Sequence, residues 1–138
     1  MQFRLFTLDE ATRALPELTA VIDKVRGQRH ALIRILVDLD NLQARQAKEG
    51  HSIELMQKMQ QRRTEVDRLR KDLARLNTTV REMGVVLRDY DEGLADFPAI
   101  VDGQPGYLCW KAGEEEITFW HGPDEGFAGR RPLRHTSR

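Results

Sequence analysis

Two stretches decide how this chain folds: LPELTAVIDKVRGQRHALIRILVDL (Leu15–Leu39) and MQQRRTEVDRLRKDLARLNTTVREM (Met59–Met83). In each, mostly apolar residues recur at alternating spacings of three and four, the heptad pattern of helices that pack along one seam. Pairing the two stretches head to tail keeps a constant register and places the reversal at residue 49, beside Gly50. The pattern therefore predicts an antiparallel coiled-coil hairpin. Its seam positions are Leu15, Leu18, Ile22, Val25, Arg29, Leu32, Leu36 and Leu39, then Met59, Arg62, Val66, Leu69, Leu73, Leu76, Val80 and Met83.

Short polar signals mark the expected helix ends. Thr7 and Glu10 have the spacing of a capping box, in which each side chain accepts a hydrogen bond from the other residue's backbone N–H. Pro16 removes a helical donor, so we expect a kink or a restart there. Ser52 suits the N-cap of the second helix, and Gly84 suits the C-terminal end of that helix.

From Val85 onward the helical period disappears, and aromatic, β-branched and turn residues take over. We expect strands at 85–89, 94–101, 106–111 and 116–120, with reversals at 91–93, 102–103 and 112–113. Such a sheet buries one face and needs cover from the base of the hairpin or from the short extended segment Phe3–Phe6.

The predicted fold class is therefore α+β: a long antiparallel two-helix coiled-coil hairpin followed by a small antiparallel β-meander packed at its base. The expected division is a helical part (1–84), a β-module with a C-terminal loop (85–133) and a mobile tail (134–138).

Composition excludes some classes of function. The 138 residues contain 22 basic and 22 acidic side chains, so net charge offers no argument for nucleic acid or membrane as a partner. The second helix is locally basic, but interleaved acidic residues favour a solvated face over nucleic-acid binding. There is no apolar stretch of membrane-spanning length and no signal-peptide pattern, so we expect a cytoplasmic protein. We expect no cofactor.

A second apolar stripe lies on the flank of the first helix, at Val21, Ile35 and Leu42. A two-helix hairpin does not need this stripe, which indicates that another element covers it. Either the β-module folds over part of it, or two copies associate as a four-helix bundle. We prefer the second alternative and expect a homodimer.

The loop from His121 to Leu133 is richer in glycine, aromatic and charged residues than a linker requires. One interpretation is a strap in which an acidic residue pairs with an arginine. The other is a recognition site in which an arginine fork and glycine amides bind a carboxylate or phosphate. On that interpretation the arginines converge with His121. The candidate residues are His121, Asp124, Glu125, Arg130 and Arg131.

Cys109 is the only cysteine, which excludes an intrachain disulfide and a multi-cysteine zinc site. It lies in an expected strand and suits a small buried position. A nucleophilic role would require a base, for which His121 is the only nearby candidate. The four histidines lack ligand spacing, so a metal site would have to join His121 with Asp or Glu partners. We predict no catalytic residue.

Several specific motifs occur along the chain: Phe6–Ala11 with Leu15-Pro16, Asp96–Ala99, Leu108–Trp110, Gly113-Glu114, Ile117–His121 and Gly126–Leu133. Together they resemble one bacterial family of uncharacterised proteins, classed as a domain of unknown function. The resemblance spans nearly the whole chain and implies a soluble bacterial protein, without an activity or a substrate.

Three functions follow as hypotheses. The first is a non-enzymatic interaction or scaffold module that self-associates through the hairpin. The second is a regulator that inserts the hairpin tip, with Glu49 and His51, into the secondary channel of RNA polymerase, because such factors are similar in layout. The third is a small anion- or metal-binding module centred on His121 and the loop rich in glycine and arginine.

Overall fold

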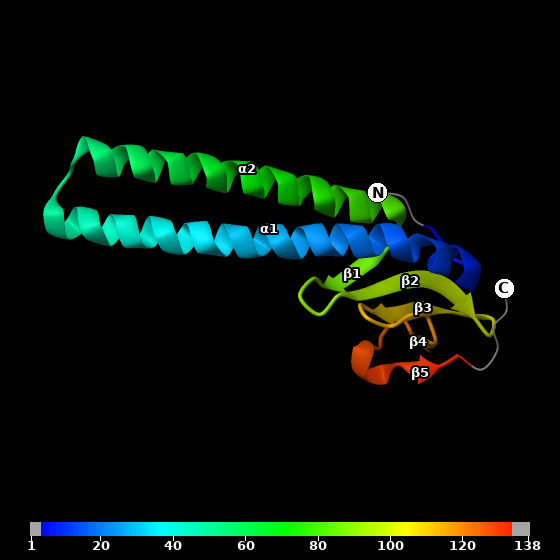
Figure 1. Cartoon of the computed structure of the whole chain (residues 1–138). Helices are drawn as coiled ribbons and strands as arrows, with labels where there is room; N and C mark the ends of the chain where they lie inside the picture. Colours follow the sequence, from blue (N-terminus) through cyan, green and yellow to red (C-terminus); the bar gives the residue numbers. More distant parts are fainter. Residues whose placement is uncertain (1–3, 134–138) are drawn as a thin grey trace. The chain divides into compact units, whose positions relative to one another are not determined.

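The computed structural model describes residues 4–133 and consists of two long helices followed by an antiparallel sheet (Figure 1). This confirms the α+β class. Within residues 4–133, neither helix carries an apolar run long enough to span a bilayer. The helices are α1 (Leu8–Glu49) and α2 (Ile53–Met83), and the strands are β1 (Val86–Asp89), β2 (Leu94–Val101), β3 (Gln104–Lys111), β4 (Phe119–His121) and β5 (Arg131–Pro132).

The chain divides into two compact units, to which both helices contribute residues. The sheet unit contains the residues up to Asp23 and those from Asn77 onward, and the hairpin unit is Lys24–Leu76. The predicted tail at 134–138 lies outside the described residues.

The N-terminus of α1 is capped as expected. The Thr7 N–H donates to Glu10 Oε1 at 2.8 Å, and the Glu10 N–H donates to Thr7 Oγ1 at 3.1 Å. The hydrogen bonds that the Glu10 carboxylate accepts from the backbone and the side chain of Thr7 lower the pKa of Glu10. The helix then continues through Pro16, so the expected restart does not occur. Leu15 and Leu18 are buried on either side of the proline, and this packing offsets the lost backbone hydrogen bond.

In the hairpin unit, the chain reverses where the sequence predicts. α1 ends at Glu49, and Gly50 adopts φ +85°, a left-handed conformation that glycine tolerates at a helix C-terminus. The Leu55 N–H donates to Ser52 Oγ at 3.1 Å, which confirms the predicted N-cap of α2.

The seam of the hairpin unit combines buried apolar residues with an ion pair between the helices. Arg62 Nε donates to Asp38 Oδ2 at 3.0 Å, so the arginine at a seam position directs its charge to an acid on α1. One predicted seam residue, Leu36, is exposed, so fewer seam positions are covered than the heptads predict. The buried apolar residues of this unit are Val25, Leu55, Met59, Val66 and Leu69.

The strands of the sheet unit follow one another in the order β1-β2-β3-β4-β5, each antiparallel to the next. The turn between β2 and β3 has positive φ at Asp102 and Gly103, as in a two-residue hairpin turn. The strand expected at 106–111 begins earlier, at Gln104. The strand expected at 116–120 occupies only 119–121, and β5 was not predicted.

One face of the sheet is covered by the N-terminal segment and the helix ends of the same unit. Phe6 packs edge to face on Phe97 with ring centroids 5.2 Å apart, and its N–H donates to the Pro98 carbonyl at 2.7 Å. Residues 4–6 give this cover without forming a strand, and Phe3 lies outside the described residues. The buried helical residues of this unit are Leu8, Ala11, Leu15, Leu18, Val21, Ile22 and Val80.

Candidate functional site

A carboxyl, a thiol and an imidazole from three neighbouring strands meet in the sheet unit: Asp96 on β2, Cys109 on β3 and His121 on β4. Asp96 lies opposite Cys109, and His121 lies opposite Tyr107. Alternate residues of a strand share a face, so Tyr107 and Cys109 present their side chains on the same side of β3. A carboxylate oxygen, the sulfur and a ring nitrogen all lie within 4.8 Å of one another. The exposed fractions of Asp96, Cys109 and His121 are 3%, 2% and 1%.

Both ring nitrogens of His121 face oxygen acceptors. Nδ1 lies 2.9 Å from the Gly122 carbonyl, and Nε2 lies 2.9 Å from Asp96 Oδ1. A carbonyl and a carboxylate each accept, whereas a neutral imidazole has only one N–H. When Nδ1 donates to Gly122, the contact between Nε2 and Asp96 therefore requires one more proton, or another cation, between the two groups.

Arg88 binds the other oxygen of the same carboxylate. Its Nε donates to Asp96 Oδ2 at 2.8 Å, and this hydrogen bond raises the pKa of Arg88. The guanidinium also lies 5.2 Å from the ring centroid of Tyr107. Arg88 thus compensates the buried charge of Asp96 and holds the carboxylate so that Oδ1 points to His121.

Cys109 has the environment of an unreactive thiol. Burial, and then the charge of Asp96, raise its pKa from 9.0 to about 11. The thiol is therefore protonated at neutral pH, and a protonated thiol is a poor nucleophile. The structure confirms that Cys109 is buried and that His121 is close to it. Cys109 and His121 together lack the lowered thiol pKa that nucleophilic catalysis by a cysteine uses.

Arg130 and Arg131 have separate acidic partners. Arg130 donates to both carboxylate oxygens of Glu114, at 2.9 and 3.0 Å, and lies between the rings of Phe119 and Phe127 at 4.0 and 4.5 Å. Burial works to raise the pKa of Glu114, but the bonds from Arg130 and from the Lys111 N–H outweigh it and leave the pKa lowered.

Arg131 pairs with Glu125 and stacks 4.2 Å from the ring centroid of Trp120. The Gly122 N–H donates to the same carboxylate at 2.7 Å, and this bond, followed by the one from Arg131, lowers the pKa of Glu125. Asp124 is exposed. The ring of His121 contacts Asp96, whereas Arg130 and Arg131 bind Glu114 and Glu125. The pair between Glu125 and Arg131 is one that the strap interpretation expects, and Arg130 adds a second ion pair to Glu114.

The candidate tip residues form local contacts. Arg45 Nε donates to Glu49 at 3.0 Å, and His51 Nδ1 lies 2.7 Å from Gln46 Nε2. Behind the tip, Glu54 pairs with Lys58 at 3.1 Å.

The flanking stripe is covered to different extents. Val21 lies in the core of the sheet unit, while Ile35 and Leu42 are half-buried in the hairpin unit. Three other apolar residues of α1 are more open: Ile33, Leu36 and Val37 are 57%, 39% and 56% exposed. The heptad pattern assigned Leu36 to the buried seam.

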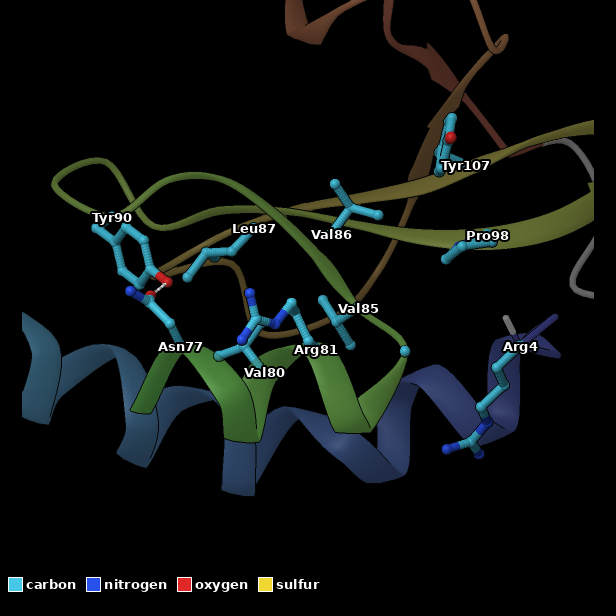
Figure 2. Close-up of a pocket in the computed structure, with 11 residues that line it drawn as sticks. Arg4, Asn77, Val80, Arg81, Val85, Val86, Leu87, Tyr90, Pro98 and Tyr107 are labelled. Atoms are coloured by element: carbon cyan, nitrogen blue, oxygen red, sulfur yellow. Dashed lines mark hydrogen bonds between the residues drawn. The ribbon is translucent and has the colours of Figure 1, made fainter. Parts of the chain in front are cut away.

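The sheet unit also contains a cavity of about 460 Å³ that sequence reasoning missed (Figure 2). Its lining includes Val80 from α2 and Pro98 and Tyr107 from the sheet. Figure 2 shows Tyr90 at one end, where its hydroxyl donates to the Asn77 side chain. The Tyr107 ring also lies 5.4 Å from the His121 ring, so this residue adjoins both the cavity and the Asp96–Cys109–His121 cluster.

The architecture is thus a helical hairpin joined in sequence to a five-stranded antiparallel sheet with a buried acid–thiol–imidazole cluster. Residues 4–133 match the family described as Uncharacterized conserved protein (DUF2203), and the chain belongs to that family. This confirms the resemblance to a family of unknown function. Neither the curated proteins nor the solved structures gave a significant match.

Proposed function

We propose that this protein is a non-enzymatic interaction module that associates with a second copy of itself through the hairpin unit. The observation that carries the proposal is the open apolar stripe of Ile33, Leu36 and Val37 on α1. Their spacing of three and four places them on one helix face. Full burial of a side chain of this size stabilises by about 1.5–3 kcal/mol, so three on each copy form a substantial interface core.

A symmetric pairing of α1 with α1 of a second copy fits this stripe. In a two-fold interface the same surface of each copy packs on itself. An antiparallel arrangement centred on Ile35 sets Ile33 of one copy opposite Val37 of the second. The two-fold axis then passes level with residue 35. The side chains of Ile35 and Leu42 project from the other side of α1, so this interface does not use the flanking residues Ile35 and Leu42.

The test is sedimentation velocity at micromolar concentration. The wild-type chain should sediment as a dimer, and Val37→Glu and Ile33→Glu should sediment as monomers. Gln61→Glu adds the same charge at an exposed position of α2 and is the matched control, which should remain a dimer. A wild-type monomer throughout the concentration range, or a dimer that both stripe variants retain, contradicts the proposal.

The contacts at the hairpin tip support a role in the secondary channel of RNA polymerase less well than the open stripe supports self-association. Glu49 and Glu54 each lie in an ion pair with a basic residue one turn away. These pairs neutralise the negative charge that a metal-linked reaction at the tip would use. Self-association rests on a specific surface, whereas the polymerase hypothesis rests on layout alone.

A further inference from the structure

We propose that Asp96, Cys109 and His121 bind a divalent transition-metal ion, for which Zn²⁺ suits the donors best. The three side chains offer oxygen, sulfur and nitrogen atoms that lie within 4.8 Å of one another in a buried position. These are the usual protein ligands of zinc. A thiolate and an imidazole favour Zn²⁺ over the harder Mg²⁺ and Ca²⁺, which prefer oxygen ligands alone.

The contacts of His121 support this assignment. Metal-binding histidines commonly donate their second ring N–H to a carbonyl or a carboxylate, which orients the ring and fixes its tautomer. Here Nδ1 lies 2.9 Å from the Gly122 carbonyl, and Nε2 points toward Asp96 Oδ1. With Nδ1 donating to Gly122, the Nε2 lone pair is directed toward Asp96 Oδ1, where a metal ion would bridge the two groups.

The charge balance also permits the ion. The bound cluster carries no net charge, because Zn²⁺ is balanced by the thiolate of Cys109 and the carboxylate of Asp96 while the imidazole is neutral. Binding forms bonds from the ion to the sulfur, to Nε2 and to the Asp96 carboxylate, and it releases to solvent the thiol proton and any proton held at Nε2. The site therefore needs no further counter-charge, and Arg88 keeps its hydrogen bond to Asp96 Oδ2.

Arg88 has a positioning role in this site. Its Nε holds Asp96 Oδ2 at 2.8 Å, which leaves Oδ1 to face His121. The three residues come from three strands paired in fixed register, so the ligand positions are set by the sheet. Rigid elements place ligands more accurately than loops do. The three residues thus supply three of the four ligands of a tetrahedral zinc site.

The experiment is a titration of the full chain with Co²⁺, which takes zinc sites and absorbs light. A thiolate bound to Co²⁺ gives an intense near-ultraviolet charge-transfer absorption. Because Cys109 is the only cysteine, this absorption reports the proposed site alone. We expect one Co²⁺ per chain with this absorption, its displacement by Zn²⁺, and a higher melting temperature with Zn²⁺. Calorimetry in buffers of different ionisation enthalpy should show release of up to two protons per ion.

Variants distinguish this site from binding at the surface. Cys109→Ser should remove the charge-transfer absorption. It should also weaken Zn²⁺ binding by more than the roughly 10–100-fold that follows loss of an outer-shell partner alone. His51→Gln removes an exposed histidine and should change neither property. Circular dichroism without metal shows whether each variant remains folded.

Two results would overturn the assignment. The first is a folded wild-type chain with no sulfur-to-cobalt absorption near neutral pH and no thermal shift with Zn²⁺. The contact between His121 and Asp96 is then a proton-bridged buried ion pair. The second is Zn²⁺ affinity that is equal in the wild-type chain and in folded Cys109→Ser, which places the ion elsewhere. Neither result affects the proposed association through the hairpin unit.

Discussion

The imidazole of His121 on β4 reaches over β3 and places Nε2 2.9 Å from Oδ1 of Asp96 on β2. Both side chains are buried, and Arg88 binds the second oxygen of the carboxylate. Three strands are thereby joined by one chain of charged contacts on a single face of the sheet.

Asp96→Ala should strongly destabilise the sheet unit. The substitution leaves His121 buried without its acidic partner, and loss of one partner of a buried charged pair costs about 3–5 kcal/mol. Urea unfolding followed by circular dichroism measures the change at neutral pH. Asp102→Asn, in the exposed turn between β2 and β3, is the control and should stay within about 0.5 kcal/mol of wild type. A similar small loss in Asp96→Ala would show that the cluster adds little to stability.

Arg130→Gln and Arg131→Gln should have unequal effects, although the two residues are adjacent. The side chain of Arg130 is 13% exposed and makes a fork to Glu114, so its loss should cost about 1.5–3 kcal/mol. The side chain of Arg131 is 52% exposed, and its ion pair should contribute about 0–1 kcal/mol. Each variant serves as the control for the other in chemical denaturation. Equal losses would contradict the assignment of Arg130 as the anchor of the strap.

Glu114 should make stability depend on pH in the acid range. Its pKa in the folded chain lies below the ordinary value of 4.5, so the unfolded chain binds more protons in that interval. The stabilisation is fully present above 4.5 and is lost as the pH falls through the folded pKa. The free energy of unfolding should therefore rise with pH across this interval.

Glu114→Gln tests this dependence, because glutamine cannot titrate. A series of urea unfolding curves across the acid range should show a smaller rise with pH than in wild type. Glu115→Gln alters the neighbouring exposed acid and should leave the slope nearly as it is. An unchanged slope in Glu114→Gln would mean that its bonds to Arg130 do not contribute to acid sensitivity.

Leu69→Ala should destabilise the hairpin unit, because Leu69 is one of its buried seam residues. Truncation of a buried leucine typically costs about 2–5 kcal/mol through lost burial and the cavity left behind. Arg70→Ala, at the next and exposed position, is the control and should cost within about 0.5 kcal/mol. Equal melting temperatures of the two variants would contradict a packed seam at Leu69.

The sequence alone predicted the order and the type of the main elements. Heptad spacing, the capping pair Thr7 and Glu10, and Gly50 are local signals, since each depends on residues within a turn or two. The two-residue turn at Asp102-Gly103 also determines the register between β2 and β3. It sets Val101 opposite Gln104, and counting back along both strands sets Asp96 opposite Cys109. This pairing identifies two of the three residues of the cluster.

The position of His121 beside Asp96 and the partners of the two arginines depended on tertiary structure. An irregular connection joins β3 to β4, so no local rule sets His121 opposite Tyr107, and only the folded sheet brings His121 to Asp96. The separate acidic partners of Arg130 and Arg131 were equally hidden, because adjacent residues of an extended segment project to opposite sides. Local spacing thus determined the helices, their caps and the hairpin turns. Side-chain meeting points between distant strands were decided by register and burial, which arise only when the whole chain packs.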